Sequence, residues 1–494
     1  MTRSHSRYPR SRIASRLIAA WFVLAMGTSL PAQRSPQPPN ILFIMVDDLG
    51  PEWVSAYGAE EIETPNIDAL AAGGMLFENV YSMPQCTPTR VTLLTGQYPW
   101  RHGWINHWDV PRWGRGCHFD PNHYTTFARI LREAGYATAI AGKWQINDFR
   151  VQPEVLVEHG FDEYCMWTGY ESGNPASAER YWDPYLHTKE GSRTYEGQFS
   201  EDVFTDFLID FMRRNRERPM MMYYPMCLTH GPMTTTPLEP NAEGRMARHK
   251  AMVRYTDHLL GKLTGALDEL GLRENTIIFW TTDNGSVGGI TGTMNGRRVR
   301  GGKGRLSEAG VRQPFIVNAP GLVPAGTRTE ALTDFTDLLP TLADLAGAPL
   351  PEGLAVDGRS FADVILGKSD DGPRDWILAM GSSPATIEKG RVVPVYEFRD
   401  RAIRDPRFKM IIGTNRRPRS LYDLIADPAE SVDLIDSTEP DAVAARKKFE
   451  SVLESLPRMD GKPLYDPLAP QAWDITDEEL ASKIGGSLAR RRAD

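Results

Sequence analysis

Cysteine is scarce in this sequence, with 4 residues among 494. Small secreted proteins that cannot build a large core rely on many disulfides, and this chain does not belong to that class. Its length is instead sufficient for more than one hydrophobic core. Its content of 41% hydrophobic and 24% charged residues is typical of a globular protein. We therefore expect a fold that is stabilised by buried apolar side chains.

An excess of positive charge is also missing. Lys and Arg number 56 and Asp and Glu number 64, which gives a formal net charge of -8 at pH 7. Proteins that bind nucleic acid through its phosphates carry a basic surface, so this balance argues against a nucleic-acid partner. If the chain acts on an anion, the positive charge for that task must be gathered at one site.

Long apolar runs are rare, and the clearest one lies near the N-terminus. Five arginines precede the apolar segment 17–30, and the motif Leu30-Pro31-Ala32 offers a small-residue cleavage site. A basic start followed by an apolar core that is short for a bilayer is typical of a secretory signal. Residues 1–32 are therefore predicted to be a signal peptide that is cleaved near Ala32. The protein is expected to be periplasmic or secreted, without a stable membrane anchor; a retained N-terminal anchor is the less favoured alternative.

Strand and helix signals alternate along the first part of the chain. Apolar runs typical of buried parallel strands are followed by helical patterns, which predicts an α/β fold with a mostly parallel central sheet flanked by helices. Four of these runs are Asn40–Val46, Ala137–Ala141, Pro219–Tyr224 and Asn275–Thr281. Residues 38–370 are assigned to this larger domain. Within it, residues 151–199 are expected to form a long loop-rich insertion.

The pattern changes near residue 371. Short strands then alternate with turns, and a helical pattern covers residues 440–456. This combination predicts a smaller C-terminal α+β subdomain over residues 371–470, in which an antiparallel sheet packs with a helix. Residues 471–494 are predicted to be a charged tail.

The four apolar runs are each followed by polar residues. Asp47-Asp48 follow the first, Lys143 the second, His230 the third and Asp283-Asn284 the fourth. Ligands of open parallel sheets bind beyond the carboxyl ends of the strands, so these side chains are expected to converge. Two adjacent carboxylates beside a buried strand repel each other unless a cation lies between them, and Ca²⁺ or Mg²⁺ would suit their oxygens. Solvated turns, and a lysine that reaches water, are the plain alternatives.

The segment Pro84–Gly96 brings a cysteine to the start of a helix. Pro88 suits the first helical turn, and Gly96 ends the helix. Cys86 would lie among free backbone N–H groups, and Arg90 adds a planar donor suited to a tetrahedral oxyanion. This arrangement favours a sulfate or phosphate group beside Cys86. The alternative is that Cys86 is a small buried apolar side chain.

These segments resemble the motifs of the type I sulfatases, which are members of the alkaline phosphatase superfamily. The similarity covers Cys86-Thr87-Pro88-Thr89-Arg90, Gly142-Lys143-Trp144, Asp283-Asn284-Gly285 and Arg300–Gly304. The resemblance implies an alkaline-phosphatase-like fold and a cysteine that a maturation enzyme oxidises to formylglycine, whose hydrated aldehyde is the nucleophile. It also implies a Ca²⁺ site formed by Asp47, Asp48, the modified Cys86, Asp283 and Asn284.

The same resemblance implies a role for each basic residue. Arg90 would orient the hydrated aldehyde, Lys143 and Lys303 would hold the sulfate, and His230 would protonate the leaving alcohol. The family has a histidine where this chain has Gln145. Glutamine donates and accepts hydrogen bonds but takes no proton, so the base that acts on the second hydroxyl of the hydrate stays open.

An aromatic loop follows the signature helix. Trp104, His107 and Trp108 are predicted, together with Gln145, to bind the substrate, although such aromatic residues are often part of a core. The predicted activity is hydrolysis of a sulfated small molecule or polysaccharide, with a formylglycine-generating enzyme as maturation partner. Two alternatives remain. One is a phosphonate monoester or phosphodiester hydrolase of the same superfamily, and the other is an inactive homologue that binds sulfated glycans.

Overall fold

The computed structural model describes residues 38–105, 117–169, 180–382, 385–388 and 391–474, and beyond them residues 476, 478, 479 and 482. The predicted signal peptide and most of the predicted tail lie outside these residues and stay predictions. Within the described part of the chain, no helix is both long enough and apolar enough to cross a bilayer.

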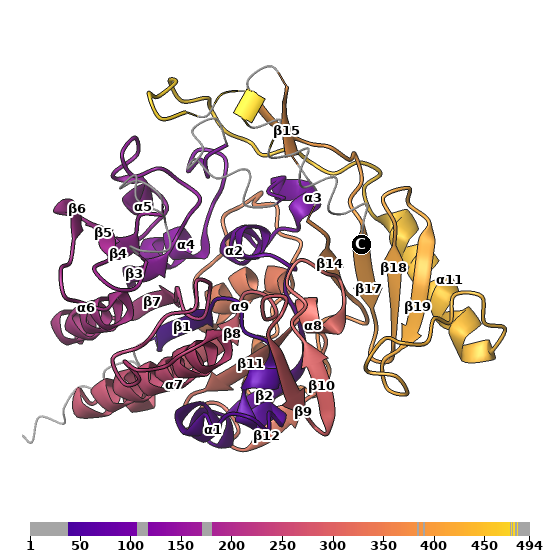
Figure 1. Cartoon of the computed structure of the whole chain (residues 1–494), viewed down its shortest axis with the longest axis horizontal. Coiled ribbons are helices and arrows are strands. Elements are labelled where there is room, and N and C mark those ends of the chain that lie inside the picture. The colour runs from indigo at the N-terminus through magenta and orange to yellow at the C-terminus, as the bar shows by residue number, and fades with distance from the viewer. Residues whose placement is uncertain are drawn as a thin grey trace, which may run out of the picture. The chain divides into compact units, whose positions relative to one another are not determined.

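A large central sheet organises the fold (Figure 1). Strand β1 (Asn40–Val46) lies at its middle and is parallel to both of its neighbours, β7 (Met220–Pro225) and β8 (Thr276–Thr282). The other strands in spatial order are β12 (Thr327–Thr329), β2 (Met75–Tyr81) and β11 (Arg312–Asn318) before β8, and β3 (Ala137–Lys143), β4 (Glu163–Trp167), β5 (Tyr185–Thr188) and β6 (Gly191–Thr194) after β7; β13 (Thr333–Asp334) pairs with β2. The predicted mostly parallel sheet is therefore confirmed, with antiparallel strands toward its edges.

The segment 151–199 differs from its expected form. Its described residues, 151–169 and 180–199, include strands that extend the central sheet: β4 pairs in parallel with β3, and β5 and β6 continue the sheet as antiparallel strands. These strands have only 4 or 5 residues, and β6 is partly exposed. The apolar run of β4 has only four residues, and β5 and β6 have no such run, so these strands give a weaker signal in the sequence than the strands at the middle of the sheet.

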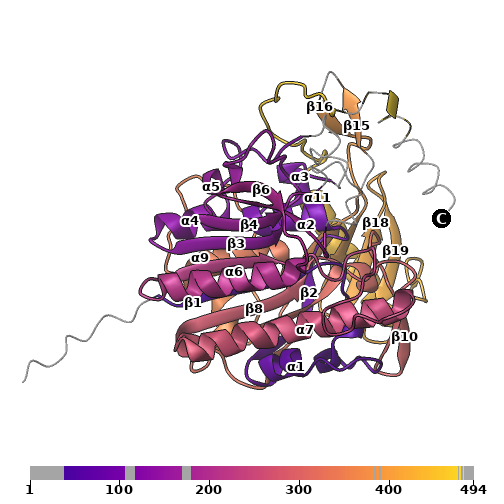
Figure 2. The same ribbon diagram turned by 60° about the vertical axis from the view of Figure 1, so that its left-hand side comes forward.

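Helices cover both faces of the sheet. One face carries α1 (Pro65–Ala72), α6 (Ser200–Asn215) and α7 (Arg245–Glu269), of which α6 and α7 lie side by side in Figure 2. The other carries α2 (Cys86–Thr95), α4 (Phe127–Glu133) and α9 (Leu338–Leu345). The side chains of β1 alternate between the two layers: Phe43 joins the core of the second face and Ile44 that of the first. A strand that is buried on both sides must be apolar throughout, which explains the continuous run in the sequence.

A second, antiparallel sheet follows in the C-terminal part (Figure 1). It contains β14 (Ile377–Met380), β17 (Arg401–Arg404), β18 (Phe408–Ile412) and β19 (Pro418–Asp423), and α11 (Pro440–Ser455) packs against it. The predicted class of this part, an antiparallel sheet with a helix, is confirmed, while the boundary near residue 371 stays a prediction. The remaining elements are α3 (Pro99–His102), α5 (Val155–Glu158), α8 (Glu308–Val311), α10 (Ala362–Ile365), β9 (Thr291–Met294), β10 (Arg297–Arg300), β15 (Ala385–Glu388), β16 (Arg391–Pro394) and the 3-10 helices η1 (Pro51–Trp53), η2 (Ser55–Tyr57), η5 (Arg273–Asn275) and η6 (Phe335–Asp337).

Candidate active site

The carboxyl ends of three parallel strands of the central sheet supply the centre of the site. Asp47 and Asp48 follow β1, Asp283 follows β8, and Lys143 is the last residue of β3. All four side chains are almost completely buried. Because β3, β7, β1 and β8 are adjacent and parallel, polar residues at their ends meet at one edge of the sheet.

The first residue of α2 brings a thiol to the same place. Cys86 is buried, as are the other three cysteines, and these four described residues form no disulfide with one another. The Oγ1 atom of Thr89 donates a hydrogen bond to Met83 O at 2.9 Å, which fixes the turn before the helix. The backbone N–H of Gly304 donates to Pro84 O at 2.7 Å and joins this turn to the loop that carries Lys303. Two segments far apart in the sequence therefore form one wall of the site.

Three carboxylates alternate with three cations around the thiol. Asp47 Oδ2 lies 2.5 Å from Lys143 Nζ, Asp283 Oδ2 lies 2.8 Å from Arg90 Nη2, and Asp48 Oδ1 lies 2.6 Å from Lys303 Nζ. Arg90 also donates to Lys143 O at 3.1 Å, so its guanidinium is held on two sides. Burial of so many charges is unfavourable unless each has a partner or the group binds a ligand.

The donor atoms of this cluster fit a hard cation. Asp47 Oδ1 and Asn284 Oδ1 are buried and have no hydrogen-bond partner in the described part of the chain. Asn284 Nδ2 donates to Asp48 Oδ1 at 2.7 Å, an orientation in which the amide oxygen accepts nothing. Asp47, Cys86 and Asp283 each offer a ligand atom, and these atoms lie within 4.8 Å of one another. Oxygen donors of this kind suit Ca²⁺ or Mg²⁺.

The protonation of the three carboxylates reflects their crowding. Burial raises the pKa of Asp283 to about 7, and the charge of Asp47 adds to the rise. Burial also raises the pKa of Asp48. For Asp47, the positive charges of Lys143 and other nearby groups outweigh burial and hold the pKa well below its ordinary value. A bound cation would keep all three side chains ionised, because its positive charge would offset both their burial and the repulsion among their negative charges.

Glycines allow the loops of the site to approach one another. A Cβ atom on Gly285, which follows Asn284, would lie 1.8 Å from Ala309 O. A Cβ atom on Gly302, which precedes Lys303, would lie 2.5 Å from Gly310 N. Both distances are too short for any side chain, so close packing of the loops requires glycine at these positions of the Asp-Asn-Gly and Gly-Gly-Lys patterns.

His230 follows β7 and completes the ring of side chains. Its Nε2 lies 3.7 Å from Asp48 Oδ2, and its side chain is 27% exposed, more than the carboxylates that it faces. Burial lowers the pKa of His230 well below its ordinary value, and the charges of Lys303 and Arg180 add to this effect. The imidazole is therefore the group of the site that lies between the buried charges and the open side.

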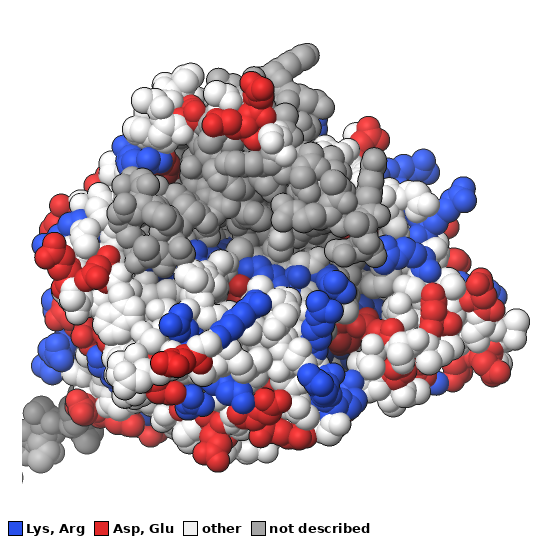
Figure 3. Space-filling model, in the orientation of Figure 1, with Lys and Arg blue, Asp and Glu red and all other residues white. Residues whose placement is uncertain are grey.

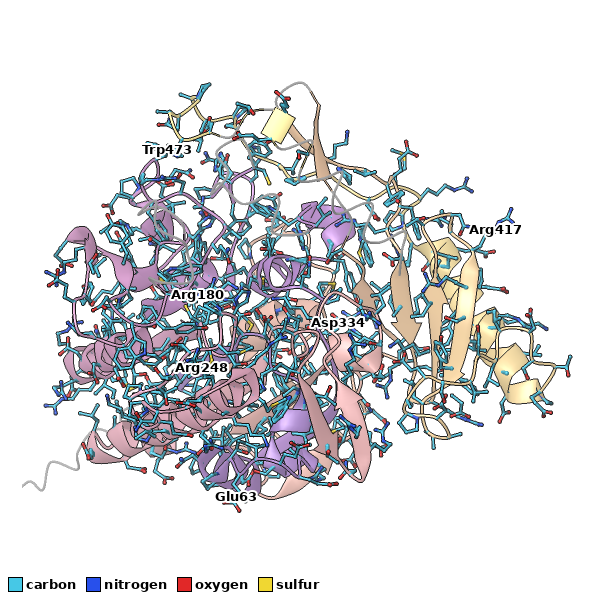
Figure 4. All side chains as sticks on the ribbon, in the orientation of Figure 1. Glu63, Arg180, Arg248, Asp334, Arg417 and Trp473 are labelled. Atoms are coloured by element: carbon cyan, nitrogen blue, oxygen red, sulfur yellow. The ribbon has the colours of Figure 1, made fainter. Side chains whose placement is uncertain are left out.

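Arg180 is a residue of the site that the sequence did not reveal. Its Nη1 contacts Nδ1 of His230 and donates to Gly231 O at 3.2 Å, and its guanidinium lies 4.0 Å from the ring centroid of Trp167. Arg180 is labelled in Figure 4. Nδ1 of His230 also lies 2.7 Å from Gly231 O. A guanidinium only donates and a carbonyl only accepts, so these two contacts on Nδ1 do not assign the ring proton to either nitrogen. No motif or spacing in the sequence indicates that Arg180 belongs to the site. Arg180 reaches His230 because its guanidinium stacks on Trp167 of β4.

The predicted substrate-binding residues are placed differently. Trp104 has no exposed surface and its ring packs edge-on against Phe119, so the expectation that it stacks on a sugar is corrected by its position in the core. Gln145 lies two residues beyond Lys143, partly exposed and with a positive φ of 60°. His107 and Trp108 lie outside the described residues, so their predicted role stays a prediction.

A family model for sulfatases matches residues 39–348, which include every charged residue of this cluster. The chain belongs to the sulfatase family. It is accordingly a sulfuric ester hydrolase. A second model, described as the C-terminal part of N-sulphoglucosamine sulphohydrolase, matches residues 302–457.

Two relatives illustrate the extent of the similarity. N-acetylgalactosamine-6-sulfatase of Canis lupus familiaris is 33% identical over 365 residues, which are 69% of this chain and 68% of the relative. N-acetylgalactosamine-6-O-sulfatase of Bacteroides thetaiotaomicron is 30% identical and aligns with 86% of this chain and 94% of its own length. The similarity to this bacterial sulfatase therefore extends over most of both chains.

Solved structures show the same architecture. The crystal structure of Ps i-CgsB, a protein also solved with k-i-k-neocarrahexaose, has a TM-score of 0.72 and 25% identity over 91% of this chain and 98% of its own. The phosphonate monoester hydrolase of Agrobacterium radiobacter has a TM-score of 0.60 and 20% identity, and covers 84% of this chain and 95% of its own. The second likeness concerns the fold alone.

Proposed function

We propose that this sulfatase is exported and releases sulfate from sulfated carbohydrates, with a formylglycine made from Cys86 and a Ca²⁺ ion at the sheet edge. The observation that carries the proposal is the position of Cys86 among three buried carboxylates and three cations, of which Arg90 and Lys143 are buried and Lys303 is 17% exposed. Asp47, Asp48, Asp283 and Asn284 would hold the ion, because two of their oxygens are buried without a hydrogen-bond partner.

The side chains of this chain supply the other requirements of sulfate-ester hydrolysis. The hydrated aldehyde would supply a hydroxyl nucleophile, and Ca²⁺ would supply positive charge for the sulfate oxygens. Arg90, held by Asp283 and Lys143 O, positions the group at residue 86. Lys143 and Lys303 neutralise sulfate oxygens, and His230 donates its Nε2 proton to the leaving oxygen. An anionic sulfate beside the imidazole favours its protonated form.

The carbohydrate part of the proposal rests on the relatives. The two relatives described above are named as sulfatases of N-acetylgalactosamine 6-sulfate, and Ps i-CgsB was solved with a carrageenan oligosaccharide. We therefore take a sulfated sugar as the substrate class and N-acetylgalactosamine 6-sulfate as the first compound to assay. The proposed export follows from the signal predicted in residues 1–32.

One experiment tests the nucleophile and the reaction together. The protein is produced with a formylglycine-generating enzyme, the peptide that contains residue 86 is analysed by mass spectrometry, and kcat/KM is measured on an aryl sulfate and on an aryl phosphodiester. We expect the mass of formylglycine and a clear preference for the sulfate ester. A Cys86→Ala variant should lose about 1,000-fold or more in kcat, because the nucleophile is removed.

Three outcomes would contradict the proposal. An unmodified thiol in fully active protein would remove formylglycine from the mechanism. A strong preference for the phosphodiester would instead favour a phosphonate or phosphodiester hydrolase, and an absence of turnover on either ester would favour an inactive glycan-binding homologue.

A further inference from the structure

A pocket of about 370 Å³ borders the loop that carries His230. It is lined by Gly231, Pro232, Met233, Gly244, Arg245, Arg248 and Val287. Gly231 is the residue after His230 and accepts a hydrogen bond from Arg180, while Val287 follows the Asp283-Asn284 pair by three residues. The pocket therefore adjoins the site on the side of the proposed proton donor.

Two arginines give this pocket its charge. Arg245 and Arg248 lie in the first turn of α7, and both are exposed. Arg245 Nη2 donates to Gly288 O at 3.2 Å and Arg248 Nε donates to Ala242 O at 3.1 Å, so backbone carbonyls orient both guanidinium groups. In Figure 3, basic side chains gather over the end of α7 that carries Arg248, which is labelled in Figure 4.

These guanidinium groups differ from the next cations of the same helix. Lys250 pairs with Glu61 at 3.1 Å and Arg254 pairs with Glu239 at 2.7 Å. Among the described residues, the ion pairs of the chain include neither Arg245 nor Arg248. Two oriented arginines without a carboxylate, in a pocket beside an anion-hydrolysing site, can take an anionic group from a ligand.

We propose that Arg245 and Arg248 bind a second anionic substituent of the substrate, either a sulfate or a carboxylate. The inference rests on the proposed function, because it assumes that His230 faces the leaving oxygen. The sugar that carries this oxygen must then extend from His230 toward Gly231 and the pocket. A second anionic group on that sugar, or on its neighbour, comes within reach of the two arginines. The enzyme is thereby selective for multiply charged carbohydrates over sugars with one isolated sulfate.

The test compares substrates that differ in their number of anionic groups. The values of kcat/KM are measured for N-acetylgalactosamine 6-sulfate, for the same sugar with a second sulfate, and for the same sugar linked to a uronic acid. We expect the wild type to prefer at least one of the two doubly charged sugars by tenfold or more. Which sugar is preferred distinguishes a sulfate from a carboxylate as the second group. In the Arg245→Gln/Arg248→Gln variant, the preference should fall to about one.

A matched control removes two positive charges elsewhere. Lys262 of α7 pairs with Asp206, and Arg213 of α6 is 60% exposed; the Lys262→Gln/Arg213→Gln variant should keep the wild-type preference. Equal loss in both double variants would mean that only net charge matters and would overturn the inference. A wild type that hydrolyses the singly sulfated sugar without any preference would also overturn it, while leaving the proposed function intact.

Binding separates this inference from the catalytic proposal. Calorimetry with Cys86→Ala protein measures the affinity for the doubly sulfated sugar without turnover. Adding Arg245→Gln/Arg248→Gln should weaken binding tenfold or more. If the wild type hydrolyses no sulfate ester, the proposed function fails. The affinity difference still decides whether the two arginines bind a second anion. An unchanged affinity would overturn the inference that they do.

Discussion

Arg180 connects the strand residue Trp167 with the imidazole of His230, and its effect on the reaction can be measured. Replacing it by glutamine removes the stacked guanidinium and its contacts with Nδ1 and Gly231 O. Misplacement of a proton donor by a fraction of an ångström lowers rates by about 10- to 100-fold. We therefore expect a loss of this size in kcat/KM on N-acetylgalactosamine 6-sulfate, whose alcohol needs a proton as it leaves. 4-Nitrophenyl sulfate should lose much less, because nitrophenolate leaves without one.

A control variant separates positioning from general damage. Arg193 also lies over an aromatic ring, that of Tyr195 at 4.7 Å, and Arg193→Gln should leave both rates unchanged. If Arg180→Gln lowered the rates on the two substrates by the same factor, His230 would not be positioned by Arg180 for proton donation.

The residues of the site were predictable from the sequence where they follow buried strands or belong to motifs that resemble those of the sulfatases. Asp47 and Asp283 stand directly after apolar runs, so the pattern that predicts the strand also predicts the side chain. Arg180 follows no such run and reaches His230 by stacking. The assignment of Trp104 was wrong for a related reason, since one aromatic residue in a loop has the same sequence signature in a core and at a binding surface.

At the scale of elements, Glu201 fastens the first turn of α6 to the loop after β7. Its carboxylate accepts hydrogen bonds from the N–H groups of Cys227 at 2.7 Å and Leu228 at 3.1 Å, and from Tyr224 Oη at 2.6 Å. Burial raises the pKa of Glu201 from 4.5 to about 7, against the lowering effect of these hydrogen bonds. The loop that carries His230 is therefore held by a carboxyl group that titrates near neutral pH.

The sign of the resulting pH dependence follows from this rise. Between pH 4.5 and 7 the folded state binds more protons at Glu201 than the unfolded chain does, so this group contributes less to stability as the pH rises through that window. The loss is on the order of 3 kcal/mol. Glutamine at position 201 does not titrate. We expect the thermal midpoint of Glu201→Gln, relative to the wild type, to be higher at pH 8 than at pH 5.

Thermal unfolding at both pH values checks this expectation. Glu217, which is 74% exposed, provides a control, and Glu217→Gln should shift the midpoint equally at pH 5 and pH 8. A constant difference between the wild type and Glu201→Gln at the two pH values would show that Glu201 is ionised in the folded protein throughout.

The elements themselves were predictable where they are both buried and long. Strand β1 has the predicted bounds, Asn40–Val46, because both of its faces are packed and every residue must be buried. Strands β4, β5 and β6 escaped prediction because they have only 4 or 5 residues. Strand β4 is buried, whereas β6 at the edge of the sheet is partly exposed and is stabilised mainly by pairing with β5.

At the scale of the whole chain, Glu308 of α8 joins the central sheet to the C-terminal sheet. Its carboxylate pairs with Arg404 of β17 at 3.0 Å and Lys409 of β18 at 3.1 Å, and it accepts a hydrogen bond from Tyr81 of β2. These cations outweigh burial and lower the pKa of Glu308 to about 2. No local pattern in the sequence predicts this contact, because the residues that form it lie between positions 81 and 409, far apart along the chain.

Removing one charged side chain from this buried cluster should weaken the contact between the central sheet and the C-terminal sheet. Glu308→Gln removes a negative charge that balances the charge of Lys409, which has no exposed surface. Such changes lower the free energy of unfolding by about 3–5 kcal/mol. Lys409→Met alone should also destabilise, whereas the double variant should be more stable than the sum of the two effects predicts. Thermal midpoints of the three variants measure this coupling, and strictly additive shifts would show that the ion pair does not hold the sheets together.

The proposed Ca²⁺ ion should stabilise the whole fold, because it binds side chains from β1 and β8 that meet only in the folded chain. By mass action, a concentration one hundred times the dissociation constant adds about 3 kcal/mol to the free energy of unfolding. We expect EGTA to lower the thermal midpoint and added Ca²⁺ to restore it. Asn284→Leu removes an amide oxygen that is buried without a partner, so the midpoint of this variant should respond less to Ca²⁺ than that of the wild type. A wild-type midpoint that does not depend on Ca²⁺ would mean that Lys143, Lys303 and Arg90 alone balance the three carboxylates.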